Sequence, residues 1–136
     1  QAIPAVVFTD PEIAWAGLTE TEAQSQGEGV QVAKFPWGAS GRAASMGRPD
    51  GLTKVIASPE TKQILGVGIV GVGAGELIAE AVVAMDRQAT APELGRSIHP
   101  HPTLSETMAE AAELAFGSTI HQAPRARGRA RRPARP

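Results

Sequence analysis

The chain has 136 residues, 42% of them hydrophobic, and a formal net charge of −1. Its length suits one domain with a real core and is too short for two ordinary ones, and its apolar runs fall far short of the roughly twenty residues that cross a bilayer, so we expect no membrane span. Because it has no cysteine, it can form no disulfide, bind no metal through thiolates and carry no redox thiol of its own.

Charge is unevenly distributed along the chain. All 14 acidic residues lie between Asp10 and Glu113, whereas six of the 13 basic residues lie within residues 125–135. Residues 122–136 combine repeated Arg and Pro with no apolar residue larger than alanine, so they cannot bury enough surface to offset the entropy of ordering. We therefore predict one folded domain over residues 1–120, with a net charge of −7, and a disordered Arg- and Pro-rich tail over residues 121–136.

Ordinary solvation is the favoured interpretation of this tail, and a patch for acidic partners is the alternative. Nucleic-acid binding is disfavoured because the tail has no aromatic residue and the acidic body would repel phosphate. The chain begins with Gln1, and no basic and then apolar leader follows it, so we expect no secretion signal and a piece of a longer protein.

The first part of the chain predicts a strand, a short helix and a second strand. The β-branched and aromatic run at residues 5–9 leads to a proline, as expected for a strand that enters a turn. Thr19 and Glu22 have the spacing of a capping box, and Gly27 supplies a left-handed stop, which indicates a short helix between them. Residues 30–35 alternate apolar and polar side chains, as a strand with one solvated face does.

The middle of the chain predicts a loop and a hairpin. Residues 36–49 are rich in Gly, Ala and Ser and show no periodicity, so we expect a loop there. Residues 51–58 and 63–70 are two apolar runs joined by turn residues. They predict two further strands in a hairpin, so at least part of the sheet should be antiparallel.

Helical patterns dominate the remainder. From about residue 74 to residue 88, apolar side chains recur on one helical face. Thr90 and Glu93 repeat the capping-box pattern and predict a short helix that Gly95 ends.

The last amphipathic pattern begins at Leu104 and ends at Gly117, with Glu110 and Glu113 expected on its outer side. The predicted order is thus strand, helix, three strands and then helices (β-α-β-β-β-α-α). This order favours an α+β domain in which helices cover an antiparallel β-sheet.

Residues 66–71, GVGIVG, match the G-x-G-x-x-G spacing of dinucleotide-binding folds. That fingerprint places its glycines in the turn between a strand and a helix, with an acidic residue at the end of the next strand. Here the glycines fall within an apolar strand pattern, and Asp86, at the right distance, falls inside the predicted helix. Glycines in a strand more often permit close approach of another backbone, so we expect no nucleotide at this segment.

Residues 97–106, SIHPHPTLSE, hold the most reactive cluster. In one interpretation Thr103 and Glu106 form a capping box, and His99 and His101 are ordinary loop residues. A metal site shared by the two histidines is disfavoured, because alternate residues of an extended segment point to opposite sides, so we predict none. In the third interpretation the Glu106 carboxylate fixes the tautomer of His101, whose other ring nitrogen can then act as a general acid or base near neutral pH.

Four segments carry a family resemblance: VVFTDPEIAWAGLTETEA, FPWGASGRAASMG, ILGVGIVGVGAGELIAEAVVAM and, above all, HPHPTLSE. Together they resemble the carboxy-terminal interface (dimerisation) domain of dihydrolipoamide dehydrogenase, in the pyridine nucleotide-disulfide oxidoreductase family. The resemblance runs from about Ile3 to Phe116 and implies the fold of that domain. The histidine segment is specific for dihydrolipoamide dehydrogenase, whereas the other three segments are also similar to glutathione, trypanothione and mercuric reductases.

The resemblance implies that His101 is the catalytic base and Glu106 the carboxylate that orients it. In such enzymes the pair reaches across the two-fold axis of a homodimer to the redox disulfide and flavin of the other subunit, where it takes a proton from dihydrolipoamide. The resemblance also implies that the backbone of His99, Pro100 and Pro102 lies near the partner's flavin. It further implies a cis peptide bond before Pro102 and a structural role for His99.

The resemblance implies FAD and NAD as cofactors of a full-length enzyme whose disulfide and cofactor-binding segments precede this domain. We therefore expect this chain alone to be inactive and to bind neither cofactor tightly. The expected partners are a second copy of the chain and dihydrolipoamide on the acyltransferase core of a 2-oxo-acid dehydrogenase complex. The expected compartment is the bacterial cytoplasm, or the mitochondrial matrix in a eukaryote.

Two alternatives and two departures accompany this interpretation. The chain could be a non-catalytic module whose acidic body binds a basic domain of the acyltransferase core, or the same domain from another flavoprotein disulfide reductase. Pro100 stands where relatives often have alanine, which should stiffen the segment without changing the catalytic spacing. The Arg-rich tail matches nothing in the family.

Overall fold

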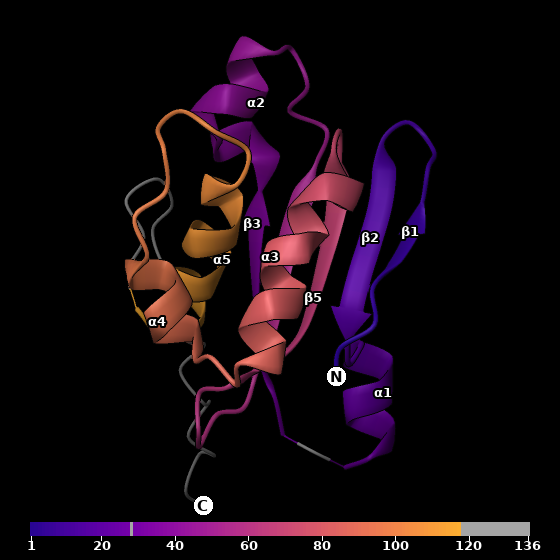
Figure 1. Ribbon diagram of the computed structural model, residues 1–136, viewed down its shortest axis with the longest axis vertical. Coiled ribbons are helices and arrows are strands. Elements are labelled where there is room, and N and C mark those ends of the chain that lie inside the picture. The colour runs from indigo at the N-terminus through magenta and orange to yellow at the C-terminus, as the bar shows by residue number, and fades with distance from the viewer. Residues whose placement is uncertain (28, 118–136) are drawn as a thin grey trace, which may run out of the picture.

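Five strands form one antiparallel sheet in the computed structural model, which describes residues 1–27 and 29–117 (Figure 1). The strands are β1 (Ala5–Val7), β2 (Glu12–Gly17), β3 (Gln31–Pro36), β4 (Leu52–Ala57) and β5 (Ile64–Gly71). Their order across the sheet is β1-β2-β5-β4-β3, and every neighbouring pair is antiparallel. The predicted hairpin is β4 and β5. The predicted boundary at residue 120 and the tail lie outside the described residues.

Helices make a second layer on one face of this sheet (Figure 1). The helical elements are α1 (Glu20–Ser25), the 3-10 helix η1 (Trp37–Ala39), α2 (Gly41–Ser45), α3 (Ala74–Asp86), α4 (Ala91–Arg96) and α5 (Glu106–Phe116). Helix α3 packs on β2 and β5, α5 packs on β3 and β4, and α4 packs on α5. This arrangement confirms the predicted α+β class with an antiparallel sheet covered by helices.

Capping explains where the short helices begin. Thr19 accepts a hydrogen bond from the Glu22 amide while the Glu22 carboxylate accepts one from the Thr19 amide, and Thr90 and Glu93 do the same. Each box satisfies amide groups that have no partner within the helix, which is why sequence spacing alone predicted the start of both helices correctly.

The predicted element order was wrong in two places. Strand β2 was missed because its side chains are apolar on both faces: Ala14 and Ala16 are buried, whereas Ile13 and Trp15 are exposed on the opposite face. No alternation of polar and apolar residues therefore marks it. The predicted loop at residues 36–49 contains η1 and α2, which are too short to show a period.

Packing between α4 and α5 corrects two further expectations. Gly95 lies inside α4 rather than after it, and a Cβ added there would lie 2.6 Å from Cγ of Glu113. The glycine therefore permits the two helices to approach closely. Glu110, expected on the outside of α5, is buried, because α5 packs against α4 and against two strands at once.

The core lies between the helical layer and the sheet. Small side chains such as Ala14, Ala81 and Ala111 are fully buried in it, which lets helices and strands pack closely. The glycine-rich segment lies within β5, as predicted, and a Cβ on Gly66 would lie 2.0 Å from the Leu18 carbonyl oxygen. Gly66 therefore permits close backbone packing.

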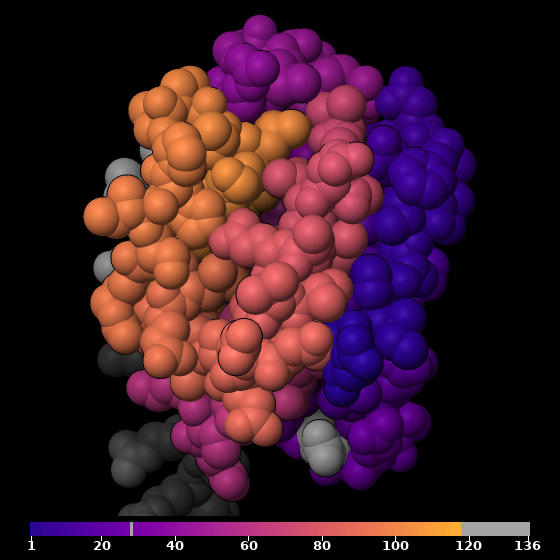
Figure 2. Space-filling view, viewed as in Figure 1, coloured from indigo at the N-terminus to yellow at the C-terminus, as the bar shows by residue number. Residues whose placement is uncertain are grey.

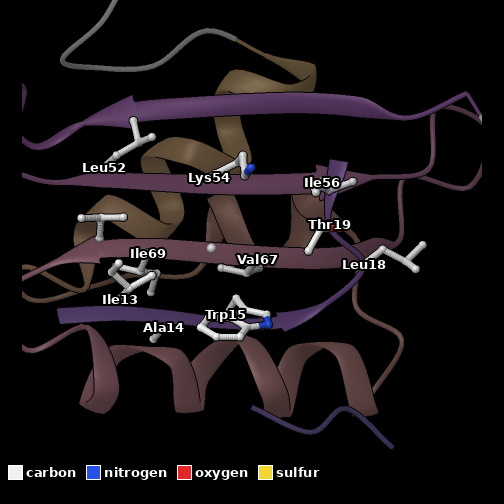
Figure 3. Close-up of a pocket in the computed structure, with 12 residues that line it drawn as sticks. Ile13, Ala14, Trp15, Leu18, Thr19, Leu52, Lys54, Ile56, Val67 and Ile69 are labelled. Atoms are coloured by element: carbon white, nitrogen blue, oxygen red, sulfur yellow. The ribbon is translucent and has the colours of Figure 1, made fainter. Parts of the chain in front are cut away.

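The other face of the sheet carries a shallow apolar groove of about 270 Å³ (Figure 3). Ile13 and Trp15 of β2 line the groove on one side of β5, and Leu52, Lys54 and Ile56 of β4 line it on the other (Figure 3). Within residues 1–27 and 29–117, the structure has no helix with the length and apolar character required to cross a bilayer.

Candidate functional site

The loop that joins α4 to α5 carries the histidine segment and lies on the helical face of the molecule. In the space-filling view of this face, the orange surface of α4 and the loop that follows it adjoins the salmon surface of α3 (Figure 2). Every residue from 97 to 102 is exposed except His99. The peptide bond between His101 and Pro102 is cis, which confirms the expectation drawn from the resemblance.

His101 and Glu106 form the predicted pair. Nδ1 of the ring lies 2.9 Å from Oε1 of the carboxylate, and the two side chains are 68% and 22% exposed. A carboxylate oxygen accepts, so Nδ1–H donates and the lone pair of the neutral ring is on Nε2. The His101 ring can therefore be reached from outside its own protomer.

Glu106 uses its second oxygen to hold the loop. Oε2 accepts a hydrogen bond of 2.7 Å from the Thr103 amide. The Thr103 hydroxyl donates to the Pro100 carbonyl at 2.7 Å, and α5 begins at Glu106 after Ser105. Only one of the two bonds of the predicted capping box is therefore formed, and the same carboxylate both holds the loop and orients the imidazole.

His99 binds a different carboxylate on a different helix. Its Nε2 lies 2.6 Å from Oε1 of Glu80 on α3, its Nδ1 lies 2.9 Å from the Ser97 carbonyl oxygen, and its side chain is only 10% exposed. The two histidines are thus held apart by separate partners. Among the described residues no group of three or more His, Asp or Glu side chains could hold a metal ion.

The environment of His99 favours its charged form. Burial lowers the pKa of the ring, but the hydrogen bonds with Glu80 and Ser97 raise it by more. The negative charges of Glu80 and Glu106 act in the same direction, so the pKa of His99 lies above its ordinary value. Both nitrogens face acceptors, and only the protonated ring can donate to both.

A buried chain of hydrogen bonds fixes the first turn of α5, where Glu106 lies. Trp37 Nε1 donates to Thr53 Oγ1 at 2.9 Å, and Thr53 Oγ1 lies 2.8 Å from Thr107 Oγ1. Thr107 in turn donates to the Leu104 carbonyl at 2.7 Å. Each hydroxyl thus donates once and accepts once, and the chain connects η1, β4 and α5.

Sequence reasoning missed Glu80 and this buried chain. Glu80 stands 19 residues before its partner His99, and a whole helix separates them in the sequence. No local spacing reveals such a pair. The groove on the open face of the sheet is separate from the His101–Glu106 pair, because α5, which begins at Glu106, lies on the opposite face (Figures 1 and 3).

Residues 3–112 match the family described as pyridine nucleotide-disulphide oxidoreductase, dimerisation domain. The dihydrolipoyl dehydrogenase of Thermus scotoductus is 54% identical over 119 residues, which are 88% of this chain and 26% of the relative. That of Halobacterium salinarum is 50% identical over 121 residues, 89% of this chain and 26% of the relative. The chain therefore spans about a quarter of the length of these curated relatives.

Solved structures show the same fold. The HOCl-induced flavoprotein disulfide reductase RclA of Escherichia coli superposes with a TM-score of 0.80 at 30% identity over 84% of this chain and 26% of its own. LpdA of Mycobacterium tuberculosis superposes with a TM-score of 0.78 at 29% identity over 82% of this chain and 24% of its own.

Proposed function

The chain belongs to the pyridine nucleotide-disulphide oxidoreductase dimerisation-domain family, and from this we propose that it is the dimerisation domain of a dihydrolipoyl dehydrogenase whose His101 and Glu106 serve the active site of the partner subunit. The observation that carries the proposal is the exposed His101–Glu106 pair, with 2.9 Å between Nδ1 and Oε1. An oriented and exposed imidazole is what general acid/base catalysis requires.

The proposed chemistry of this chain is proton transfer. His101 Nε2 takes the proton of a dihydrolipoamide thiol, and the dihydrolipoamide is carried by the acyltransferase core of a 2-oxo-acid dehydrogenase complex. The Glu106 carboxylate stabilises the resulting imidazolium. Because the Thr103 amide holds the other carboxylate oxygen, Glu106 is kept in the orientation that serves the ring.

Electron transfer belongs to the rest of the full-length enzyme, where FAD and NAD⁺ supply the electron acceptors. Two glycines of the G-x-G-x-x-G segment face protein atoms instead of an open phosphate site: a Cβ on Gly71 would lie 2.3 Å from the Trp37 ring, and a Cβ on Gly66 would lie 2.0 Å from the Leu18 carbonyl oxygen. Other domains would therefore hold both cofactors, and the exposed loop at residues 97–102 would approach the flavin of the partner subunit.

The surface around the pair suits coverage by a second subunit. Ile98 is fully exposed, next to His99, and Val83 is exposed on α3, one turn after Glu80. The Glu80–His99 contact brings these two apolar side chains to the same region. Exposed apolar side chains beside a functional group are typical of an interface, which supports a dimer that forms through the helical face.

Substitution of His101 tests the proposal. A chimeric enzyme, in which the matching 119 residues of the Thermus scotoductus dihydrolipoyl dehydrogenase are replaced by this domain, supplies the missing parts. His101→Gln in the chimeric enzyme should slow dihydrolipoamide oxidation by roughly 10²-fold or more, the scale of lost general-base catalysis. Arg96→Gln, at an exposed residue beside the loop, is the matched control and should have little effect.

A second reaction separates lost chemistry from lost folding. Oxidation of NADH by an artificial electron acceptor needs the flavin but no thiol proton, so His101→Gln should retain it. Dihydrolipoamide turnover that is unchanged by His101→Gln would exclude this residue from the chemistry.

A further inference from the structure

We infer that Glu80 is a positioning residue for His101: by binding His99, it clamps the exposed loop of residues 97–102 onto α3 and so holds the imidazole of His101 in place. This inference rests on the proposed function for its catalytic consequence. Its structural part stands on the contacts of the loop alone.

The first step is that only one side chain of the loop turns inward. From residue 97 to residue 102, His99 alone is not exposed, and its side chain is 10% exposed. The remaining side chains of this stretch therefore contribute little packing to hold it. The bond of 2.6 Å between His99 Nε2 and Glu80 Oε1 ties the loop to α3.

The second step is that fixing the position of His99 also restricts the position of His101. Only Pro100 separates the two histidines, and its ring fixes one backbone dihedral angle. The Pro100 carbonyl also accepts the hydroxyl of Thr103 at 2.7 Å, which limits the other. The tripeptide of residues 99–101 is thus held at one end by Glu80 and at the other by Glu106.

The third step is that protonation of the ring strengthens the clamp. Nδ1 of His99 faces the Ser97 carbonyl and Nε2 faces the Glu80 carboxylate, so loss of the proton removes one of the two donors. The charged groups that act on this ring are Glu80 of α3 and Glu106 of α5, both negative. The clamp is therefore closed at low pH and loosens as the pH rises through the folded-state pKa of His99, which is raised.

NMR of the 136-residue chain with ¹⁵N-labelled histidine tests the structural part without any activity measurement. Glu80→Gln should move the titration midpoint of the His99 ring to lower pH. Glu80→Ala should speed hydrogen exchange at the Thr103 amide by roughly tenfold or more, because that amide is protected by Glu106 only while the loop is held. Glu76→Gln, one turn earlier on α3, should change neither.

Kinetics of the chimeric enzyme test the catalytic part. Glu80→Ala should lower kcat for dihydrolipoamide by roughly tenfold, with KM within about twofold, as loss of orientation at the reacting group does. At low pH, Glu80→Gln should have most of the kcat of the unchanged chimeric enzyme. As the pH rises, the kcat of Glu80→Gln should fall at a lower pH than the kcat of the unchanged chimeric enzyme does. Adding Glu80→Ala to His101→Gln should cost nothing further, because Glu80 acts only through His101.

The two arms can fail separately. Unchanged Thr103 exchange in Glu80→Ala would overturn the clamp, whatever the kinetics show. Additive losses in Glu80→Ala/His101→Gln would overturn the positioning role. If His101→Gln alone leaves turnover unchanged while Glu80→Ala speeds Thr103 exchange, the proposed function falls and the loop clamp stands.

Discussion

At Glu106, one carboxylate meets two requirements of an acid/base site. Oε1 faces the imidazole of His101 and Oε2 accepts the Thr103 amide, so the position of the carboxylate is determined by the loop that it serves. The pair could be predicted from the sequence because its members stand only five positions apart and a helix begins at the second of them. The Glu80–His99 pair could not, because its geometry exists only after the loop between α4 and α5 has packed on α3.

The charged state of His99 should be visible in the pH dependence of stability. Its folded-state pKa is raised, so its contribution is fully present below the unfolded-state value of about 6.5 and is lost as the pH rises through the folded-state pKa. His99→Gln should therefore lower the free energy of unfolding by about 1–3 kcal/mol at pH 5.5 and by clearly less at pH 9, measured by urea denaturation.

Glu80→Gln is the informative companion of this measurement, because it keeps the shape of the carboxylate and removes its charge. It should abolish most of the pH-dependent part of the free energy of unfolding that His99 contributes, whereas Glu76→Gln should preserve it. A penalty for His99→Gln that is equal at the two pH values would show that folding does not raise the pKa of His99.

At the scale of elements, α5 depends on a polar chain that runs through the core. Trp37, Thr53 and Thr107 are fully buried or nearly so, and their hydrogen bonds connect the sheet to the first turn of the helix that carries Glu106. A buried network of this kind is stable only while every donor has an acceptor. The position of the candidate site therefore depends on residues that do not touch it.

Thr53→Val tests this network. Valine keeps the size of threonine but leaves the Trp37 N–H without its acceptor and removes the bond to Thr107, so the free energy of unfolding should fall by about 1–3 kcal/mol. In a double-mutant cycle with Trp37→Phe, the losses should be less than additive, since both changes delete the same bond. Strict additivity would contradict the proposed coupling.

The glycines of β5 give a sharper prediction, because two of them differ only in their surroundings. A Cβ on Gly66 would lie 2.0 Å from the Leu18 carbonyl oxygen, whereas a Cβ on Gly68 would meet only Cε of Lys54, at 3.7 Å. Gly66→Ala should therefore destabilise the protein by roughly 1–3 kcal/mol or more through overpacking. Gly68→Ala should be neutral or stabilising by up to about 1 kcal/mol, and thermal melting of both variants checks the contrast.

Elements could be predicted where one short-range rule determines them. The capping boxes at Thr19 and Thr90 satisfy amide groups within four residues, so spacing alone revealed α1 and α4. Strand β2 and helix α2 depend instead on what packs against them. Ala14 is buried only because α3 covers it, and a two-sided apolar strand such as β2 carries no alternating pattern.

At the scale of the whole molecule, the two faces of the sheet have different roles. The helical face carries the His101–Glu106 pair, Val83 and Ile98, whereas the open face carries the groove around Trp15 (Figure 3). A base that serves a partner must lie at the face where the partner sits. The proposed function therefore assigns the two-fold axis of the dimer to the helical face and leaves the groove outside it.

Mixed dimers test this assignment together with the contribution in trans. One chimeric enzyme carries His101→Gln, and a second retains His101 but lacks the redox cysteines that its other domains supply. Each should be inactive alone. When the two are dissociated and reassociated together, one site of each mixed dimer should combine an intact base with an intact disulfide. Random pairing should then restore roughly a quarter of the unmodified activity.

The position of the two-fold axis of the dimer determines which surface substitution prevents mixed dimers from regaining activity. Val83→Lys in both subunits places charges at the proposed interface, so it should weaken the dimer and abolish the restored activity. Ile13→Lys changes an exposed apolar residue of the groove on the opposite face, so it should leave dimerisation and the restored activity unchanged. Sedimentation of each variant measures dimerisation independently of turnover. Mixtures with no restored activity, although mixed dimers form, would place the base and the disulfide of a working site in the same subunit.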